Sequence, residues 1–521
     1  MANEVQKDTQ QEIVVTSKGF MGVIEKAANK IPHPGLIFFW LSVVVMILSF
    51  FLAQAGVSAI HPSKGEEIKI VSLLNADFIG TFLVDMGKTF ATFAPFQTVL
   101  LVTLGMGVAN STGLLNNTLK LVGVSSSNAF VLSYVVALVG ILGNLAGDVA
   151  SYVLPSLCAL LFFACGRNPI AGLLLSYSAG GVGFGANFIV GSGDVTLSGL
   201  SDAAAKLMDP AFECSPAMGW FFMAATTPIL ALLLTLVSLK WIEPKLNKAG
   251  IGTSYKGEGG TSELDQLKIQ ENEKAGLKAA LIALLIQVAI WVVMCLPGMP
   301  LGAPEGKTIF DGKLLKSITA FLFFMFLIPA WAYGKKTGSI KNFKDVAKFM
   351  GEEIKTLSPF FVVSFFAAEF MYLFSASNLG QIIAIKGGEA IGASGISNSF
   401  VLVVMILMVC VINFFIPSSS AKWALLAPVF VPMLMVIGIS PAAAQTAYRI
   451  GDGMTNSLTP MMASMVVNLA YAQKYDSRVQ LGTMFANLVP LNIVPGIFWI
   501  AILVIWCQLG LPLGPGYTPF L

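Results

Sequence analysis

The feature that most constrains this chain is the length of its stretches without a charged residue. These stretches are 36–60, 89–119, 121–147, 215–239, 279–304, 317–334, 390–421 and 479–521. Most of them reach the roughly 20 residues that an α-helix needs to cross a hydrocarbon core about 30 Å thick. Of the 521 residues, 56% are hydrophobic and only 11% are charged. A water-soluble fold cannot bury so much apolar surface, so the sequence predicts an all-α polytopic membrane protein.

The placement of lysines predicts which segments face the cytoplasm. Lysines cluster in the N-terminal segment 1–30, in the polar linker 243–276 and in 334–355. Positively charged loops are retained inside, so we expect these three segments on the cytoplasmic side of the cytoplasmic (inner) membrane. The charge-free stretch 479–521 places the C-terminus on the extracytoplasmic side. This topology predicts about nine transmembrane helices plus two re-entrant helical hairpins.

The linker also predicts the organisation of the chain into two halves. Residues 243–276 mix Gly, Ser, Thr and charged side chains, a composition typical of a flexible connector. The first transmembrane half is expected over 31–242 with a hairpin near 147–194, and the second over 277–521 with a hairpin near 417–460. No nucleic-acid-binding module is visible, and the expected surroundings are the lipid bilayer.

An amphipathic segment lies inside the third lysine cluster. Between Lys341 and Lys355, apolar residues alternate with charged ones at helical spacing. This pattern predicts a helix that lies at the membrane interface, with a solvated loop helix as the alternative.

Each half carries one copy of a pattern of helix-breaking and polar residues. The copies lie about 270 positions apart, a fixed offset of the kind that internal repeats produce. The matched residues are Asn144/Asn413, Pro155/Pro428, Gly166/Gly438, Pro169/Pro441, Gly180/Gly451 and Asn187/Asn456. Inside a bilayer, non-helical backbone is tolerated only where protein or water satisfies its polar groups. The pattern therefore predicts an inverted-repeat ion-transporter-type architecture with a site between the halves, and chance alignment is the alternative.

Several charged residues interrupt or border the apolar runs. They are Asp148, Arg167, Asp194, Glu369, Lys422, Arg449 and Asp452. A charge at the centre of a membrane helix costs about 2.5 to 3.5 kcal/mol, so these residues must pair or face water. Arg167 precedes Asn-Pro and is compatible with an ordinary cation at a helix end. Glu369, in an apolar run, is open to a structural or a functional interpretation.

The second repeat gathers most of the chemistry. Arg449 and Asp452 share a helix face if the helix is continuous, either as a helix-end salt bridge or as part of a binding site. Arg449 can donate two N–H groups to a carboxylate. Trp423 offers a flat face to an aromatic ring, although a tryptophan at the membrane interface is the simpler interpretation. Asp194, just beyond the first broken segment, and Asp452 are expected to carry a proton or to help hold sodium. These residues predict a small aromatic carboxylate as solute.

Other function classes find little support. The glycines of 181–185 look like a potassium-channel filter, but the hydroxyl residue expected before it is Gly180, and the second repeat lacks the motif. An ion channel is therefore a remote alternative. We find no HExxH, paired-Cys or GxSxG motif, and the chain has only His33 and His61. We expect no enzyme activity and no cofactor other than a possible bound sodium ion.

The motifs resemble those of the AbgT family of p-aminobenzoyl-glutamate transporters. The matching segments are 31–34 (IPHP), 146–155 (AGDVASYVLP), 166–172 (GRNPIAG), 412–428 (INFFIPSSSAKWALLAP) and 447–452 (AYRIGD). The resemblance covers nearly the whole chain and implies a homodimer of nine-span subunits with an inward-opening aqueous bowl. It also implies cation-coupled movement of aminobenzoyl-glutamate or, in some members, export of sulfonamide antimetabolites.

The resemblance also implies particular site residues. Carried over by motif, the solute pathway consists of Asp194, Ser420, Trp423, Pro441, Arg449, Asp452 and Pro460. The implied sodium site comprises Asn413, the backbone at Pro417 and Asn456. Pro417 stands where the family run is expected to have Gly; proline keeps its carbonyl but restricts φ, which weakens the sodium prediction.

The predicted function is secondary active transport of p-aminobenzoyl-glutamate or a related aminobenzoate across the cytoplasmic membrane. A sodium or proton gradient would drive it. The alternative is a proton-driven efflux pump that exports sulfonamide antimetabolites. The direction of transport follows from gradients and stoichiometry rather than from sequence.

Overall fold

The structure is a computed structural model that describes residues 34–521 apart from 62–64, 116, 119–127, 147–148, 254–268, 305–312, 315–316 and 460–461. The predicted N-terminal segment 1–30 and Asp148 therefore lie outside the described residues. In the first half of the chain the elements are α2 (Pro34–Gln54), β1 (Ser58–Ile60), β2 (Glu67–Lys69), α3 (Ala76–Thr92), α4 (Ala94–Ser111), α6 (Ala129–Leu142), the 3₁₀ turn η1 (Gly143–Ala146), α7 (Val149–Ala164), α8 (Pro169–Val182), α9 (Ser192–Ala205), α10 (Trp220–Val237), the π-helical turn η2 (Ser238–Ile242) and α11 (Glu243–Lys248).

The second half is helical wherever it has regular secondary structure. Its elements are α13 (Glu271–Met294), α14 (Ile318–Thr337), α15 (Phe343–Thr356), α16 (Ser358–Ala376), α17 (Leu379–Ala393), α18 (Asn398–Asn413), α19 (Ser419–Val436), α20 (Pro441–Thr455), α21 (Ala463–Tyr475) and α22 (Leu481–Gln508). Helix α15 coincides with the predicted amphipathic segment. In the described part of the chain, strands β1 and β2 form a single antiparallel hairpin.

The helices confirm the predicted all-α polytopic membrane fold. Six of the described helical segments are long and apolar enough to cross a membrane, and the number rises to 8 if each of two bent pairs is one span. The bent pairs are α15–α16, at 60°, and α17–α18, at 118°. Helix α19, predicted as an arm of a re-entrant hairpin, is among the six. The count of nine spans stays a prediction.

The matched segments fold into two helical hairpins, α7–α8 and α19–α20. Gly166 (φ 70°) and Gly438 (φ 81°) adopt the left-handed conformation that ends the first helix of each hairpin. The second helix begins on a proline in both hairpins, after Asn168 in one and Ser440 in the other. The side chains of these two residues accept hydrogen bonds from backbone N–H groups of the first turn. The common offset therefore reflects a shared local structure.

The helices extend into the predicted linker from both sides. Helix α10 continues through η2 and α11 to Lys248, and α13 begins at Glu271. Glu243, predicted to begin a flexible connector, accepts two hydrogen bonds from Arg167, of 3.1 Å from Nε and 2.5 Å from Nη2. Arg167 also donates to Ser133 Oγ at 2.9 Å. Arg167 therefore fixes the turn of the first hairpin to α11, which is the structural interpretation of this buried charge.

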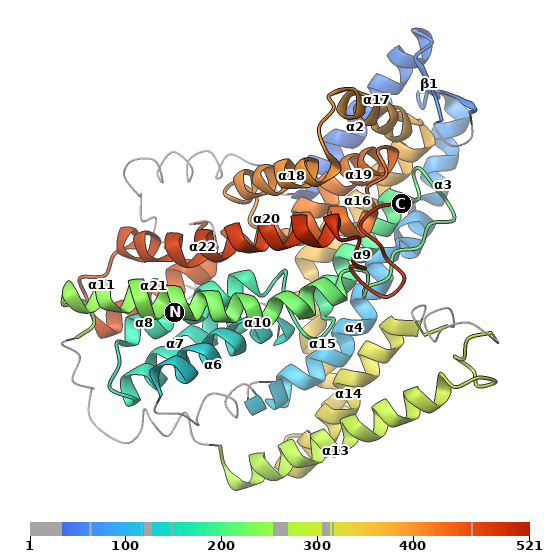
Figure 1. The fold of residues 1–521 in the computed structure, drawn as a ribbon. Helices are drawn as coiled ribbons and strands as arrows, with labels where there is room; N and C mark the ends of the chain where they lie inside the picture. Colours follow the sequence, from blue (N-terminus) through green and yellow to red (C-terminus); the bar gives the residue numbers. More distant parts are fainter. Residues whose placement is uncertain are drawn as a thin grey trace, which may run out of the picture.

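The packing of the helices brings the two hairpins together (Figure 1). Helices α13 and α14 pack side by side, and α4 packs against α14, α15 and α9. Helix α9 also packs against α19, while α20 contacts α8, α9, α18 and α22. Helices α2, α3 and α17 surround α16 near the β-hairpin. Every residue of α20 is buried, so its polar side chains must find partners inside the protein.

Candidate functional site

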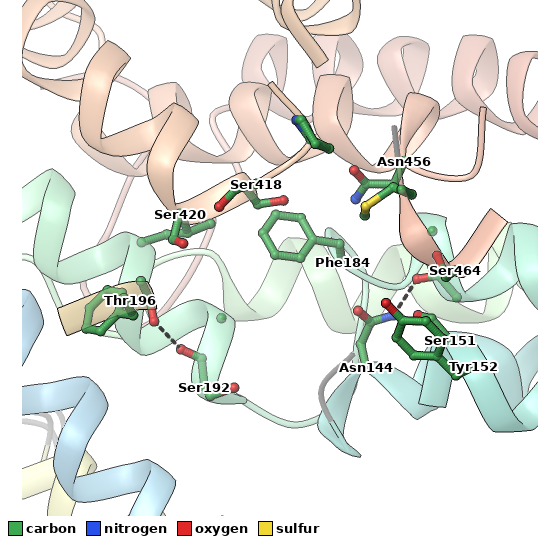
Figure 2. A pocket seen from close by; sticks show the side chains of 18 of the residues that line it. Asn144, Ser151, Tyr152, Phe184, Ser192, Thr196, Ser418, Ser420, Asn456 and Ser464 are labelled. Atoms are coloured by element: carbon green, nitrogen blue, oxygen red, sulfur yellow. Dashed lines mark hydrogen bonds between the residues drawn. The ribbon is translucent and has the colours of Figure 1, made fainter. Parts of the chain in front are cut away.

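A cavity of about 630 Å³ lies where the open ends of the two hairpins meet α9 (Figure 2). Helix α9 begins at Ser192 on this cavity, and α19 begins after Ser418. Helix α8 ends beyond Gly181, and Asn456 follows α20. Two helix N-termini and two helix C-termini therefore border one space. The N-termini carry partial positive charge and the C-termini partial negative charge.

The lining of the cavity is rich in hydroxyl groups. These groups belong to Thr103, Ser151, Tyr152, Tyr177, Ser192, Thr196, Ser418, Ser419, Ser420, Ser457 and Ser464. Among the described lining residues the one charged side chain is Glu353, on α15, whose Oε1 lies 3.3 Å from Asn110 Nδ2. The cavity therefore offers hydrogen-bonding groups rather than a cluster of charges.

The ring of Phe184 stands in the middle of this space (Figure 2). Phe184 follows α8 and is flanked by two glycines that are closely packed. A Cβ on Gly183 would collide with a backbone carbonyl, and a Cβ on Gly185 would come within 2.5 Å of a tryptophan ring. This packing holds the loop with the phenylalanine in the cavity. The guanidinium of Arg449 lies 5.1 Å from the centre of the Phe184 ring, within reach of a cation–π interaction.

Arg449 and Asp194 form a buried ion pair beside Phe184. Arg449 Nη1 donates to Asp194 Oδ1, and Arg449 Nε donates to the backbone oxygen of Phe184 at 2.9 Å. Asp194, in the first turn of α9, also accepts from the N–H of Gly191 at 2.6 Å. The two charged residues are only 6% and 4% exposed. In this conformation Arg449 is directed at Asp194 and Phe184 and is not among the described lining residues.

A second ion pair joins Asp452 to Lys422. Both residues are fully buried, and Lys422 Nζ donates to Asp452 Oδ1. Asp452 Oδ2 accepts from Ser419 Oγ at 2.6 Å and from Asn456 Nδ2 at 3.0 Å. The helix-end salt bridge between Arg449 and Asp452 is not formed, because each residue pairs elsewhere. The sequence shows Lys422 as a charge in an apolar run, but its partner is set by how α19 and α20 pack.

The predicted sodium ligands lie partly together. Asn413 Nδ2 donates to Asn456 Oδ1 at 3.0 Å and to the backbone oxygen of Asp452 at 3.1 Å. Lys422 Nζ donates to Asn413 Oδ1 and lies 3.4 Å from the backbone oxygen that precedes Pro417. Pro417 itself lines the cavity. The oxygens that sodium would need therefore surround an ammonium group, so a sodium ion fits only where Lys422 withdraws.

Trp423 lies away from the cavity. It is fully buried, its Nε1 donates to Ser201 Oγ at 3.0 Å, and its ring stacks on Tyr448 with the centres 4.4 Å apart. The aromatic ring that faces the cavity is instead that of Phe184, which the sequence interpretation missed. The available signal was the glycine-rich segment around it, which we considered only as a channel filter or a nucleotide motif.

The other residues implied by the family motif lie in different places. Ser420 lines the cavity in the first turn of α19 (Figure 2). Pro441 is the first residue of α20, about 12 Å along the helix axis from Arg449 at about 1.5 Å per residue. Pro460 lies outside the described residues.

The comparisons with known proteins identify the family. Residues 19–521 match the family described as "AbgT putative transporter family". The chain belongs to the AbgT transporter family. It is also 34% identical over 500 residues to the p-aminobenzoyl-glutamate transport protein of Escherichia coli (strain K12), covering 96% of each chain. The resemblance drawn from the sequence motifs is therefore confirmed.

Two solved AbgT-like structures match the fold. The YdaH transporter of Alcanivorax borkumensis is 34% identical with a TM-score of 0.87, over 93% of this chain and 100% of that one. MtrF of Neisseria gonorrhoeae, described as illuminating a class of antimetabolite efflux pumps, is 35% identical with a TM-score of 0.89, over 96% of this chain and 100% of that one. Together with the apolar helices, these similarities identify a multi-pass membrane transporter.

Proposed function

We propose that this AbgT transporter is a secondary active carrier of p-aminobenzoyl-glutamate or a related aminobenzoate. The observation that carries the proposal is the hydroxyl-lined cavity at four helix ends with an aromatic ring in its centre. Its volume of about 630 Å³ is in the usual range for small-molecule sites, roughly 300 to 1,000 Å³. The name of the Escherichia coli relative states the same solute. A sodium or proton gradient would drive the transport.

The geometry suggests how such a solute would bind. Its carboxylates would lie at the N-termini of α9 and α19, where Ser192, Ser418 and Ser420 add hydroxyl donors to the helix N–H groups. Its aromatic ring would lie against Phe184, in the offset or edge-on contact that ring pairs prefer. Arg449 would act through Phe184, by fixing its backbone oxygen and the underside of its ring.

Counterflow in proteoliposomes tests the proposal directly. Vesicles loaded with unlabelled aminobenzoyl-glutamate should take up the labelled solute without any gradient, and protein-free vesicles should not. Accumulation should then require a gradient, and collapsing the sodium and proton gradients separately identifies the coupling ion. If the purified protein catalyses no counterflow of aminobenzoates, the proposal is wrong.

Efflux of antimetabolites is the second candidate. Two observations favour it: the similarity to MtrF, and a cavity without a cation among its described lining residues, which suits an uncharged arylamine sulfonamide. Cells that express the protein should then hold less sulfonamide, and dissipating the proton gradient should abolish the difference. A carrier for aminobenzoyl-glutamate alone would leave cellular sulfonamide unchanged.

The remaining expectations belong to the same proposal. We propose a homodimer in the cytoplasmic membrane with a cytoplasmic N-terminus and an extracytoplasmic C-terminus. Light scattering of the purified protein should give twice the mass of the 55.3 kDa chain after correction for detergent. A terminal cysteine label that reacts with impermeant reagents only from the opposite side would contradict the orientation.

A further inference from the structure

Helix α16 contains a buried carboxyl group that the proposed solute site does not use. Glu369 is the only charged residue of this helix, whose sequence is SPFFVVSFFAAEFMYLFSA. The residue is 5% exposed, and neither carboxyl oxygen has a hydrogen-bond partner in the described part of the chain. Buried polar groups are nearly always paired, so a carboxyl group with two unpaired oxygens requires an explanation.

Aromatic contacts place Glu369 between α16 and two neighbouring helices. On one side, Phe365 packs against Phe90 and Tyr372 stacks on Phe82, with ring centres 5.5 and 6.1 Å apart, so α3 covers that side. On the other side a further phenylalanine pair joins α16 to α2. At about 100° per residue, Glu369 points between these two contacts. Its carboxyl group is therefore surrounded mainly by rings.

The helices that pack against α16 offer no cation to this carboxyl group. Helices α2 and α4 have no charged residues. The charged residues on the other packed helices are Asp77, Asp85 and Lys88 on α3, Lys344, Asp345, Lys348, Glu352, Glu353 and Lys355 on α15, Lys386 and Glu389 on α17, and Lys422 on α19. Lys422 pairs with Asp452, and Lys386 lies 3.3 Å from Glu389.

Asp85 is the charged residue nearest in level to Glu369. It lies between the α3 residues that contact Tyr372 and Phe365, so the two acids face the same seam. A second acid disfavours ionisation of the first. An ionised carboxylate without a partner in such a place costs several kcal/mol, whereas the protonated acid is tolerated.

We propose that Glu369 is a proton-binding site and carries the proton that drives this transporter. The proton is taken from water onto a carboxylate oxygen of Glu369 in one conformation. It is returned to water on the other side when α16 moves and hydrates the group. This inference rests on the proposed carrier function and commits to the proton as the coupling ion.

The same helix connects this group to the solute cavity. Phe360, near the start of α16, lines the cavity, about 13 Å along the axis from Glu369 at about 1.5 Å per residue. Helix α16 also packs against α19, the first helix of the second hairpin. A movement of α16 that reshapes the cavity therefore also changes the surroundings of Glu369. Such a shared element is what coupling between two sites requires.

Glu369→Gln tests the proposal, with Asp85→Asn as the matched control. The glutamine variant should keep counterflow of aminobenzoyl-glutamate within about twofold of the wild type, because exchange needs no net proton movement. It should lose accumulation driven by a proton gradient at least about tenfold, since 1.4 kcal/mol corresponds to a factor of ten. Asp85→Asn should keep both activities. A pH indicator inside the vesicles should report solute-coupled proton movement for the wild type and the control only.

The outcomes separate this inference from the proposed function. If Glu369→Gln accumulates solute like the wild type, or loses counterflow and accumulation in equal proportion while remaining folded, the proton assignment is overturned and the carrier function stands. If the wild type itself shows no counterflow, the carrier function fails. Should the glutamine variant not fold, Glu369→Asp decides. Accumulation with a shifted pH optimum supports the assignment, and an unchanged optimum overturns it.

Discussion

Two ion pairs fix the charged residues of α20 in a fully buried helix. Arg449 pairs with Asp194 and Asp452 pairs with Lys422. Each pair joins helices that are separate elements of the fold, so neither is a local helix-end salt bridge. Removing one member of a buried pair leaves an uncompensated charge, which is more harmful than removing both members.

This asymmetry gives a prediction for Lys422. Lys422→Met should destabilise the protein by about 3 to 5 kcal/mol, because Asp452 then lies buried without its cation. The double variant Lys422→Met/Asp452→Leu should recover part of the loss. Thermal unfolding in detergent measures both effects. Equal melting temperatures for the single variant and the wild type would show that the pair contributes nothing to the fold.

A second prediction at this scale concerns Phe184. Phe184→Ala should raise the KM for aminobenzoyl-glutamate roughly tenfold, because an aromatic contact is worth about 1.5 kcal/mol. Phe184→Tyr should keep the ring contact and most of the affinity. Equilibrium binding of the labelled solute to purified protein checks whether the change is one of affinity. An unchanged KM for Phe184→Ala would mean that the solute ring lies elsewhere.

At the scale of elements, the two hairpins have the same turn chemistry. Gly438 has φ 81° in the turn between α19 and α20, and no atom lies within 4 Å of the position that a Cβ would occupy. A side chain there meets strain from its backbone conformation alone, at a cost of roughly 1 to 2 kcal/mol. Gly438→Ala should therefore lower the melting temperature by a few degrees.

The matched control for this substitution is Gly482→Ala. Gly482 lies in the first turn of α22, also has nothing within 4 Å, and its φ is not positive. Alanine should be neutral or slightly stabilising at this helical position. If both variants unfold at the same temperature, the left-handed turn is not what constrains Gly438.

The hairpins were predictable from the sequence, because the residues that break and cap helices act locally. Gly166, Gly438 and the helix-starting prolines set these turns whatever surrounds them. The site was less predictable. The position of Trp423 inside the protein and of Phe184 in the cavity depends on which faces of α8 and α19 pack inward. The partner of Arg449 lies on α9, which no local pattern specifies.

At the scale of the whole molecule, the two halves of the chain contact each other at the cavity. Each half contributes one hairpin, and the asparagine before each hairpin donates to a backbone oxygen of its second helix: Asn144 to Gly180 and Asn413 to Asp452. The repeat therefore extends to hydrogen bonding. The chemistry differs between the copies, since the described charged pairs at the site all include a residue of the second hairpin.

The contact between the halves gives the last prediction. A Cβ on Gly181 would lie 3.1 Å from the backbone nitrogen of Ser457, at the end of α20, so alanine there forces the two hairpins apart by a few tenths of an ångström. Gly180 is the matched control, because its nearest neighbour would lie 3.8 Å away. Both glycines line the same cavity. A steric effect of the solute site alone would therefore affect both variants alike.

Gly181→Ala should slow counterflow several-fold while leaving the amount of folded protein unchanged, because carriers of this kind move one repeat against the other. Gly180→Ala should transport at close to the wild-type rate. Initial rates in proteoliposomes, normalised to protein that elutes as a single species, measure the difference. Equal rates for the two variants would show that the hairpin contact tolerates separation, and the moving interface would then have to lie elsewhere, for example where α9 packs against α19.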